Sequence, residues 1–133
     1  MKSVRGGCFC GAVRYEARGA PSNSMICHCR MCRAVAGALA VPWVTFEREG
    51  FRFTKGRPKA FKSSRPVRRT FCCGCGTPLT YQTSKWPRTI DITTCSMDRP
   101  ERFPPTHRSW VSHDVGWMKS SDKLRKYPKS RFG

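Results

Sequence analysis

The sequence predicts one mainly β domain of short antiparallel strands with one or two short helices. Short segments alternate apolar and polar residues between turn signals, which is typical of half-buried strands. Among 133 residues there are only three Leu and three Ile, with eight Phe, four Trp and three Tyr, so the expected core is thin. Eight of the nine cysteines lie in clusters and offer the metal or covalent cross-links that such a core needs.

The elements follow from these patterns in order along the chain. The alternation of residues 12–18 predicts a strand. A short helix is expected at residues 29–36, and Gly37 would end it. Segment 38–46 is β-rich, but Pro42 would break it or place it at an edge. Further strands are expected at 51–54, 77–83 and 89–94.

The length corresponds to one domain, which we place at residues 1–118. From Lys119 onward the chain is basic and loses its apolar periodicity. Residues 119–133 are therefore expected to form an exposed basic C-terminal tail.

Several classes of protein are disfavoured by the sequence. The sequence has no stretch of 18 apolar residues, so no membrane span is predicted. The N-terminus lacks the apolar region of a secretion signal. Neither common phosphate-binding loop motif is present. Without secretion, cysteines are more often metal ligands than disulfides, so we expect a cytoplasmic metal-binding protein.

Four cysteines form two similar pairs, and each pair ends in a glycine. Cys8 and Cys10 precede Gly11, and Cys72 and Cys75 precede Gly76. A glycine there permits the positive φ of a metal-binding turn. Together the pairs offer four thiolates, the ligand set of a closed structural zinc site.

The remaining cluster is Cys27, Cys29 and Cys32, which we predict as the catalytic group. Three protein ligands with one open position are typical of a catalytic zinc. Three alternatives remain open: a fourth ligand from Cys73, Cys95 or a histidine, a metal-free cluster, or zinc bound only when the metal is abundant.

The three histidines are expected to support the structure. His28 lies between two proposed ligands and is read as supporting the site from outside the ligand set or as exposed. His107 and His113 are assigned structural roles.

Three spaced motifs resemble the glutathione-dependent formaldehyde-activating family, also called the domain of centromere protein V. They are Gly-Cys-Phe-Cys-Gly-Ala-Val-Arg-Tyr at 7–15, Cys-His-Cys-Arg-Met-Cys-Arg at 27–33 with Gly37 after it, and Phe-Cys-Cys-Gly-Cys-Gly-Thr-Pro-Leu at 71–79. Residues 96–100, His107 to Trp110 and Trp117 match more loosely, so the resemblance covers about residues 5–118. Cys73 and Cys95 depart from the family pattern.

The resemblance implies a zinc-containing β-tent fold with two zinc ions per chain. It implies a structural zinc on Cys8, Cys10, Cys72 and Cys75, and a second zinc on Cys27, Cys29 and Cys32 that accepts an outside thiol. The implied reaction is that of a carbon–sulfur lyase, the joining of glutathione to formaldehyde as S-hydroxymethylglutathione. Chemistry agrees, because a thiolate is a strong nucleophile and formaldehyde a strong electrophile.

Arginines beside the cysteine motifs could bind the carboxylates of glutathione. We assign this role to Arg30 and Arg33, and Arg68 and Arg69 flank the third motif in the same way. For each of the four taken alone, a solvated surface position is the more common outcome.

The charge supports an alternative function. The net charge is +18, and the segment between Glu49 and Asp91 contains ten basic residues and no acidic one. Such a domain attracts anions, so the alternative is a zinc module that binds nucleic acid non-specifically. A noncatalytic module that recruits a protein partner is the third reading, and it predicts two closed metal sites. The aromatic residues within this segment are read as the inner face of an alternating strand.

Overall fold

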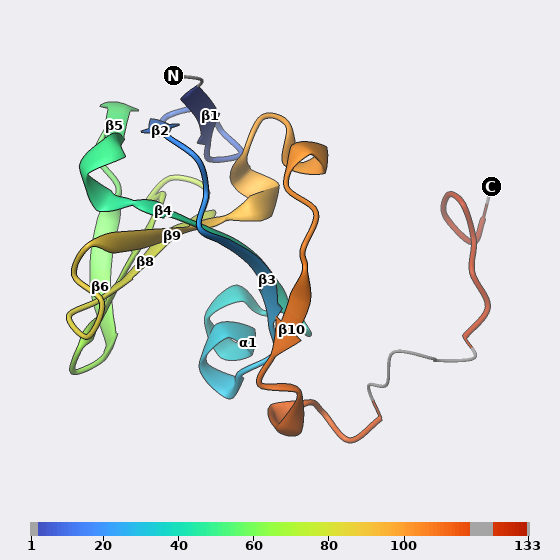
Figure 1. The fold of residues 1–133 in the computed structure, drawn as a ribbon. Helices are drawn as coiled ribbons and strands as arrows, with labels where there is room; N and C mark the ends of the chain where they lie inside the picture. The colour runs from blue at the N-terminus through green and yellow to red at the C-terminus, as the bar shows by residue number, and fades with distance from the viewer. Residues whose placement is uncertain (1–2, 118–123, 133) are drawn as a thin grey trace.

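The computed structural model describes residues 3–117 and 124–132, and its strands form two sheets (Figure 1). The smaller sheet has the order β1-β2-β5 and is antiparallel throughout. The larger has the order β10-β3-β4-β9-β8-β7-β6, in which only β10 runs parallel to its neighbour β3. The prediction of a mainly β fold of short antiparallel strands is therefore confirmed, with one parallel pair as the exception.

The strands are β1 (Ser3–Gly7), β2 (Arg14–Arg18), β3 (Asn23–Cys27), β4 (Val41–Glu47), β5 (Phe51–Lys55), β6 (Lys59–Ser64), β7 (Val67–Phe71), β8 (Pro78–Thr83), β9 (Thr89–Thr93) and β10 (His107–Ser109). Helix α1 covers Arg30–Ala36. Single 3-10 turns cover Arg48–Gly50, Thr94–Ser96, Pro100–Arg102 and Val111–His113.

The predicted helix is present with the predicted end. The sulfur of Cys29 accepts a hydrogen bond from the Cys32 amide and caps the N-terminus of α1. Gly37 has a φ of 61° and closes the C-terminus, where its N–H bonds to the Arg33 carbonyl. The helix lies beside the end of the large sheet where β3 and β10 pair (Figure 1).

Pro42 behaves differently from expectation, because it neither breaks β4 nor lies on an edge strand. It is the second residue of β4, which pairs with β3 on one side and β9 on the other. Pairing with β9 begins only at Trp43, so the missing Pro42 N–H removes no bond from that ladder.

The main core lies where the two sheets face each other. The small sheet contributes Tyr15 and Ala17, and the large sheet contributes its buried aliphatic side chains together with Phe46. Tyr15 is 1% exposed, and its hydroxyl forms a 2.7 Å hydrogen bond with the Ser96 hydroxyl. A Cβ at Gly6 would lie 2.3 Å from that tyrosine oxygen, so only glycine fits there. Cys8 and Cys72 belong to the same core, which ties the first metal-binding group to the packing of both sheets.

Part of the predicted C-terminal tail, residues 119–123 and 133, lies outside the described residues. Residues 124–132 are exposed and consist of coil and turns. The division between residues 1–118 and 119–133 stays a prediction.

Candidate metal centres

The first centre brings together four sulfurs from two turns. The sulfurs of Cys8, Cys10, Cys72 and Cys75 all lie within 4.8 Å of one another. Cys8 and Cys10 follow β1, and Cys72 and Cys75 follow β7. The group therefore joins the small sheet to the large one across more than sixty residues of sequence, as a cross-link for a thin core should.

The two turns have the same backbone design. Gly11 and Gly76 have φ values of 79° and 81°, and each donates its N–H to the carbonyl of the first cysteine of its pair. Backbone N–H groups also point at the sulfurs: Val13 donates to Cys8 Sγ at 3.2 Å, and Gly74 donates to Cys72 Sγ at 3.3 Å. Such donors stabilise negative charge on sulfur, so the backbone is prepared for thiolates.

The four sulfurs compete for protons because they are so close. A hydrogen bond from the Thr77 hydroxyl is the main reason that the pKa of Cys75 falls to about 5. For Cys10 a bond from the Ala12 backbone lowers the pKa, but the three neighbouring sulfurs outweigh it and raise the value to about 11. A divalent cation would resolve this competition, because it stabilises all four thiolates at once.

The second centre contains the sulfurs of Cys27, Cys29 and Cys32, again within 4.8 Å of one another. Cys27 ends β3, Cys29 caps α1, and Cys32 lies in the first turn of that helix. No other Cys, His, Asp or Glu among the described residues places a ligand atom in this group. Cys73 and Cys95 are exposed and belong to neither group. The described chain thus supplies three ligands and no fourth.

Charge within the second centre is concentrated on Cys32. The sulfur of Cys27 lowers the pKa of Cys32 to about 5; burial opposes this change, and the Arg69 guanidinium adds to it. In return, the hydrogen bond with Cys32 raises the pKa of Cys27. The shift favours the thiolate of Cys32, which is the form that binds metal.

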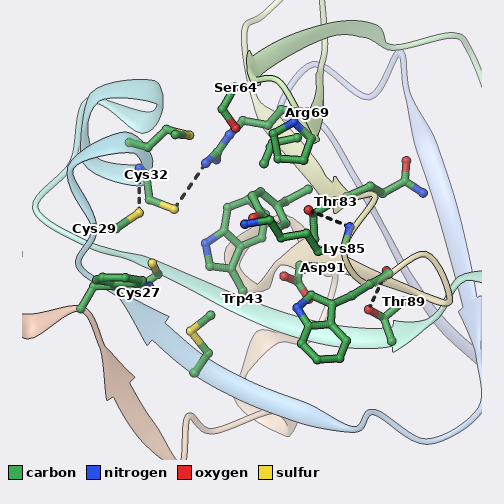
Figure 2. A pocket seen from close by; sticks show the side chains of 18 of the residues that line it. Cys27, Cys29, Cys32, Trp43, Ser64, Arg69, Thr83, Lys85, Thr89 and Asp91 are labelled. Carbon is green, nitrogen blue, oxygen red and sulfur yellow. Dashed lines mark hydrogen bonds between the residues drawn. The ribbon is translucent and has the colours of Figure 1, made fainter.

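Arg69 is the flanking arginine that departs most from its predicted setting. The more common outcome for it was a solvated surface position, but it is 3% exposed. Its Nη2 donates to Cys32 Sγ at 3.6 Å, and its Nε donates to the Ser63 hydroxyl at 2.8 Å. Figure 2 shows the guanidinium reaching from β7 toward the cysteine group.

His28 lies outside the ligand set but is not exposed. It is 2% exposed, and Arg108 donates to its Nε2 at 3.1 Å. Because that nitrogen accepts, the proton sits on Nδ1 and is donated to Asp114 at 2.6 Å. The His28 amide also donates to the Ser109 carbonyl, so the residue fastens β10 and the following loop to the cysteine motif.

The other two histidines differ from each other. His107 is exposed, and its ring bonds to the Thr106 hydroxyl. His113 packs its ring against Trp110 with centroids 4.9 Å apart, and its carbonyl accepts a 2.9 Å bond from Arg33. Arg33, predicted to bind a ligand carboxylate, thus uses one of its nitrogens to hold the backbone, and its role toward a ligand stays a prediction.

The three-cysteine group opens into a cavity of about 610 Å³ (Figure 2). Four aromatic side chains line it: Trp43, Tyr81, Trp86 and Trp110. Its basic side chains are Arg30, Arg69 and Lys85, and Asp91 is its one acidic side chain. No local sequence pattern shows that Trp43, Tyr81 and Asp91 meet in one cavity, because strands far apart in sequence bring them together.

Asp91 faces the cavity from β9. Burial raises the pKa of its carboxyl, while a 2.5 Å hydrogen bond from the Thr45 hydroxyl acts in the opposite direction. The alternation of β9 gave a signal for this placement, since Ile90 and Ile92 point into the core and Asp91 therefore points away from it.

Residues 3–113 match the family described as glutathione-dependent formaldehyde-activating enzyme. The chain belongs to this family. Among solved structures, a crystal structure of a Rhodobacter sphaeroides protein is similar in fold, with a TM-score of 0.65 and 20% sequence identity, over 79% of this chain and 99% of that chain. A search of curated proteins gave no match.

Membership of the formaldehyde-activating family confirms the resemblance noted in the sequence. It implies a glutathione-dependent formaldehyde-activating enzyme, and the two cysteine groups could each hold a metal ion. Among the described residues, no helix is long and apolar enough to cross a membrane.

Proposed function

We propose that this chain binds glutathione through its sulfur at Cys27, Cys29 and Cys32 and adds that sulfur to formaldehyde or a related aldehyde. The reaction class is that of a carbon–sulfur lyase, with S-hydroxymethylglutathione as the product. One observation carries this proposal. The three sulfurs lie within 4.8 Å of one another, no other described residue places a ligand atom beside them, and they face a cavity of about 610 Å³.

The residues of both groups fit zinc. Ligand sets made only of thiolates favour zinc over hard cations such as magnesium or calcium. Four sulfurs with N–H donors match a closed structural site, and three sulfurs beside a cavity match an open one. The chemistry that zinc supplies when bound in the open group is to keep an incoming sulfur in its nucleophilic thiolate form.

The residues around the open group bind and orient the substrate. The cap of α1 fixes Cys29 and Cys32 relative to each other. The aromatic side chains of the cavity offer apolar surface to the peptide part of glutathione. Arg30 and Lys85 line the cavity with exposed cationic side chains and are the proposed partners of the two carboxylates. Arg33 instead holds the His113 backbone in place.

The proposed reaction balances without an oxidant or reductant. The glutathione thiol loses its proton to solvent as it binds. Its sulfur then forms a bond to the formaldehyde carbon, and the electron pair of the C=O π bond moves to oxygen. That oxygen takes a proton from water, which gives the hydroxymethyl thioether.

The state of the cysteines also indicates the cellular compartment in which we place the protein. All nine are free of disulfide bonds, which favours a reducing environment, and we place the protein in the cytoplasm. In the same proposal, residues 1–118 form the catalytic domain, and residues 119–133 lie outside it.

Nucleic-acid binding is the second candidate because of the exposed charge. Nine of the ten basic residues between Glu49 and Asp91 are exposed, and Arg69 alone is buried. The aromatic residues of this segment do not all point inward as expected: Phe51 and Phe53 pack on the core, but Phe61 is exposed against Phe71. A noncatalytic scaffold with two closed sites is less well supported, because the described residues provide no fourth ligand to the second group.

A salt series separates the two candidates. Glutathione binding to the zinc-loaded protein, followed by calorimetry, should change less than about threefold between roughly 50 and 200 mM salt, because the sulfur contact supplies most of the affinity and exposed ion pairs to Arg30 and Lys85 add little. Binding of single-stranded nucleic acid through six to ten phosphates would weaken by about 10³-fold or more over that range. Nuclear magnetic resonance with carbon-13 formaldehyde should show S-hydroxymethylglutathione forming faster than without protein.

The matched control for this experiment is Cys73→Ser, since Cys73 is exposed and lies outside both groups. This variant should bind glutathione as the unmodified protein does. Absence of glutathione binding in the zinc-loaded protein, together with product formation at the uncatalysed rate, would contradict the proposed function.

A further inference from the structure

Arg69 is a buried cation in contact with the open cysteine group. Its side chain comes from β7 and lies between the Cys32 sulfur at 3.6 Å and the Ser63 hydroxyl at 2.8 Å (Figure 2). The guanidinium carbon also lies 4.9 Å from the ring centroid of Tyr81 and 5.9 Å from that of Trp43. These contacts fix both the position and the plane of the guanidinium.

The charge of Arg69 has no carboxylate partner among the described residues. None of the ion pairs formed by these residues includes it, and Asp91, the acidic side chain of the same cavity, bonds to Thr45 instead. A buried guanidinium without a counter-charge is strongly destabilising, and an arginine cannot shed its proton to avoid the cost. The cysteine group is therefore its counter-ion.

The contact between Arg69 and Cys32 affects which fourth ligand the open group can accept, because it changes the local charge. Three thiolates and one divalent cation carry one net negative charge, and a fourth thiolate would double it. In a partly buried site, that added charge is costly unless a cation lies close by. A neutral fourth ligand, such as imidazole, adds no charge and does not need the cation.

On these grounds, and resting on the function proposed above, we propose that Arg69 is a positioning residue that makes the open cysteine group select an anionic fourth ligand, a thiolate, over a neutral one. It acts through the Cys32 sulfur and the local charge, and it does not take part in bond making. The selection therefore belongs to the cysteine group itself and extends to thiols that have no carboxylate.

The test uses two small probes of opposite type on the full-length, metal-loaded protein. 2-Mercaptoethanol binds as a thiolate, imidazole binds as a neutral ligand, and neither carries a carboxylate that Arg69 could bind directly. Cobalt(II) in place of zinc reports each ligand through its visible absorption. The measured quantity is the ratio of the two dissociation constants in each variant.

Arg69→Met should weaken 2-mercaptoethanol binding by roughly tenfold or more, the usual effect of losing a charged hydrogen bond. The dissociation constant for imidazole should stay within about twofold of that of the unmodified protein. Arg69→Lys keeps the charge and should restore most of the thiolate preference. Arg68→Met is the matched control, because the neighbouring Arg68 is exposed on the same strand. That control should leave both constants unchanged.

An Arg69→Met variant whose ratio equals that of the unmodified protein would overturn the proposal, as would equal weakening of both ligands. If Arg69→Met does not fold, Arg69→Lys and Arg69→Gln provide the same comparison with and without the charge. Failure of the proposed function would give a different result. The ratio of the two dissociation constants would still depend on Arg69, but the unmodified protein would not bind glutathione.

Discussion

Replacing Cys29 with serine is expected to abolish thiol binding and remove one of two zinc ions, while the fold is kept. Cys29 is one of the three proposed ligands of the open group, and two ligands hold zinc poorly. Even loss of a group that only supports a ligand costs 10–100-fold in metal affinity, so loss of the ligand should cost at least about 100-fold. Metal analysis and glutathione calorimetry measure both effects.

The fold should survive this change because of the second role of Cys29. Its sulfur caps α1 by accepting the Cys32 amide hydrogen, and serine is among the preferred residues at such a position. Circular dichroism should therefore remain that of the unmodified protein. A Cys29→Ser protein that still carries two zinc ions per chain and binds glutathione normally would show that the second group is not the thiol site.

Replacing Cys72 with serine is expected to have the opposite result, the loss of the fold itself. Cys72 is 2% exposed, belongs to the main core and is a proposed ligand of the closed group. Structural zinc binding contributes about 10–16 kcal/mol in small zinc peptides, comparable to the 5–15 kcal/mol total stability of a typical domain. Thermal melts followed by circular dichroism should show no cooperative transition.

Cys95→Ser provides the control for this prediction, since Cys95 is exposed and outside both groups. It should melt as the unmodified protein does. A strong zinc chelator added to the unmodified protein should reproduce the effect of Cys72→Ser. Retention of a normal melting temperature after either treatment would mean that packing alone holds the two sheets together.

Local signals predicted the cysteine turns and the helix well. A helix cap, a terminating Gly37 and glycines at positive φ depend on neighbouring residues, so they can be read from short stretches of sequence. The grouping of Cys8 and Cys10 with the later pair was suggested by the similarity of their motifs, and the structure brings these four sulfurs together.

Features that depend on distant strands were missed. Five strands were not predicted: β1, β3, β6, β7 and β10. Of these, Asn23–Cys27 has no alternating pattern and Lys59–Ser64 is mostly exposed. The burial of Arg69 depends on Trp43 from β4 and Tyr81 from β8, which no local pattern reveals. A weak signal was present: in β7, Arg69 shares a face with Val67 and Phe71, and that face is turned inward.

The proposal that the second group holds zinc with an open ligand position is tested most directly by X-ray absorption at the zinc edge, recorded before and after glutathione is added. With one closed and one open site, the mean number of sulfur ligands per zinc should rise from about 3.5 to about 4. The Cys29→Ser protein should show no such rise. A mean of four sulfurs before addition, or no change after it, would contradict an open three-cysteine site and with it the enzymatic function.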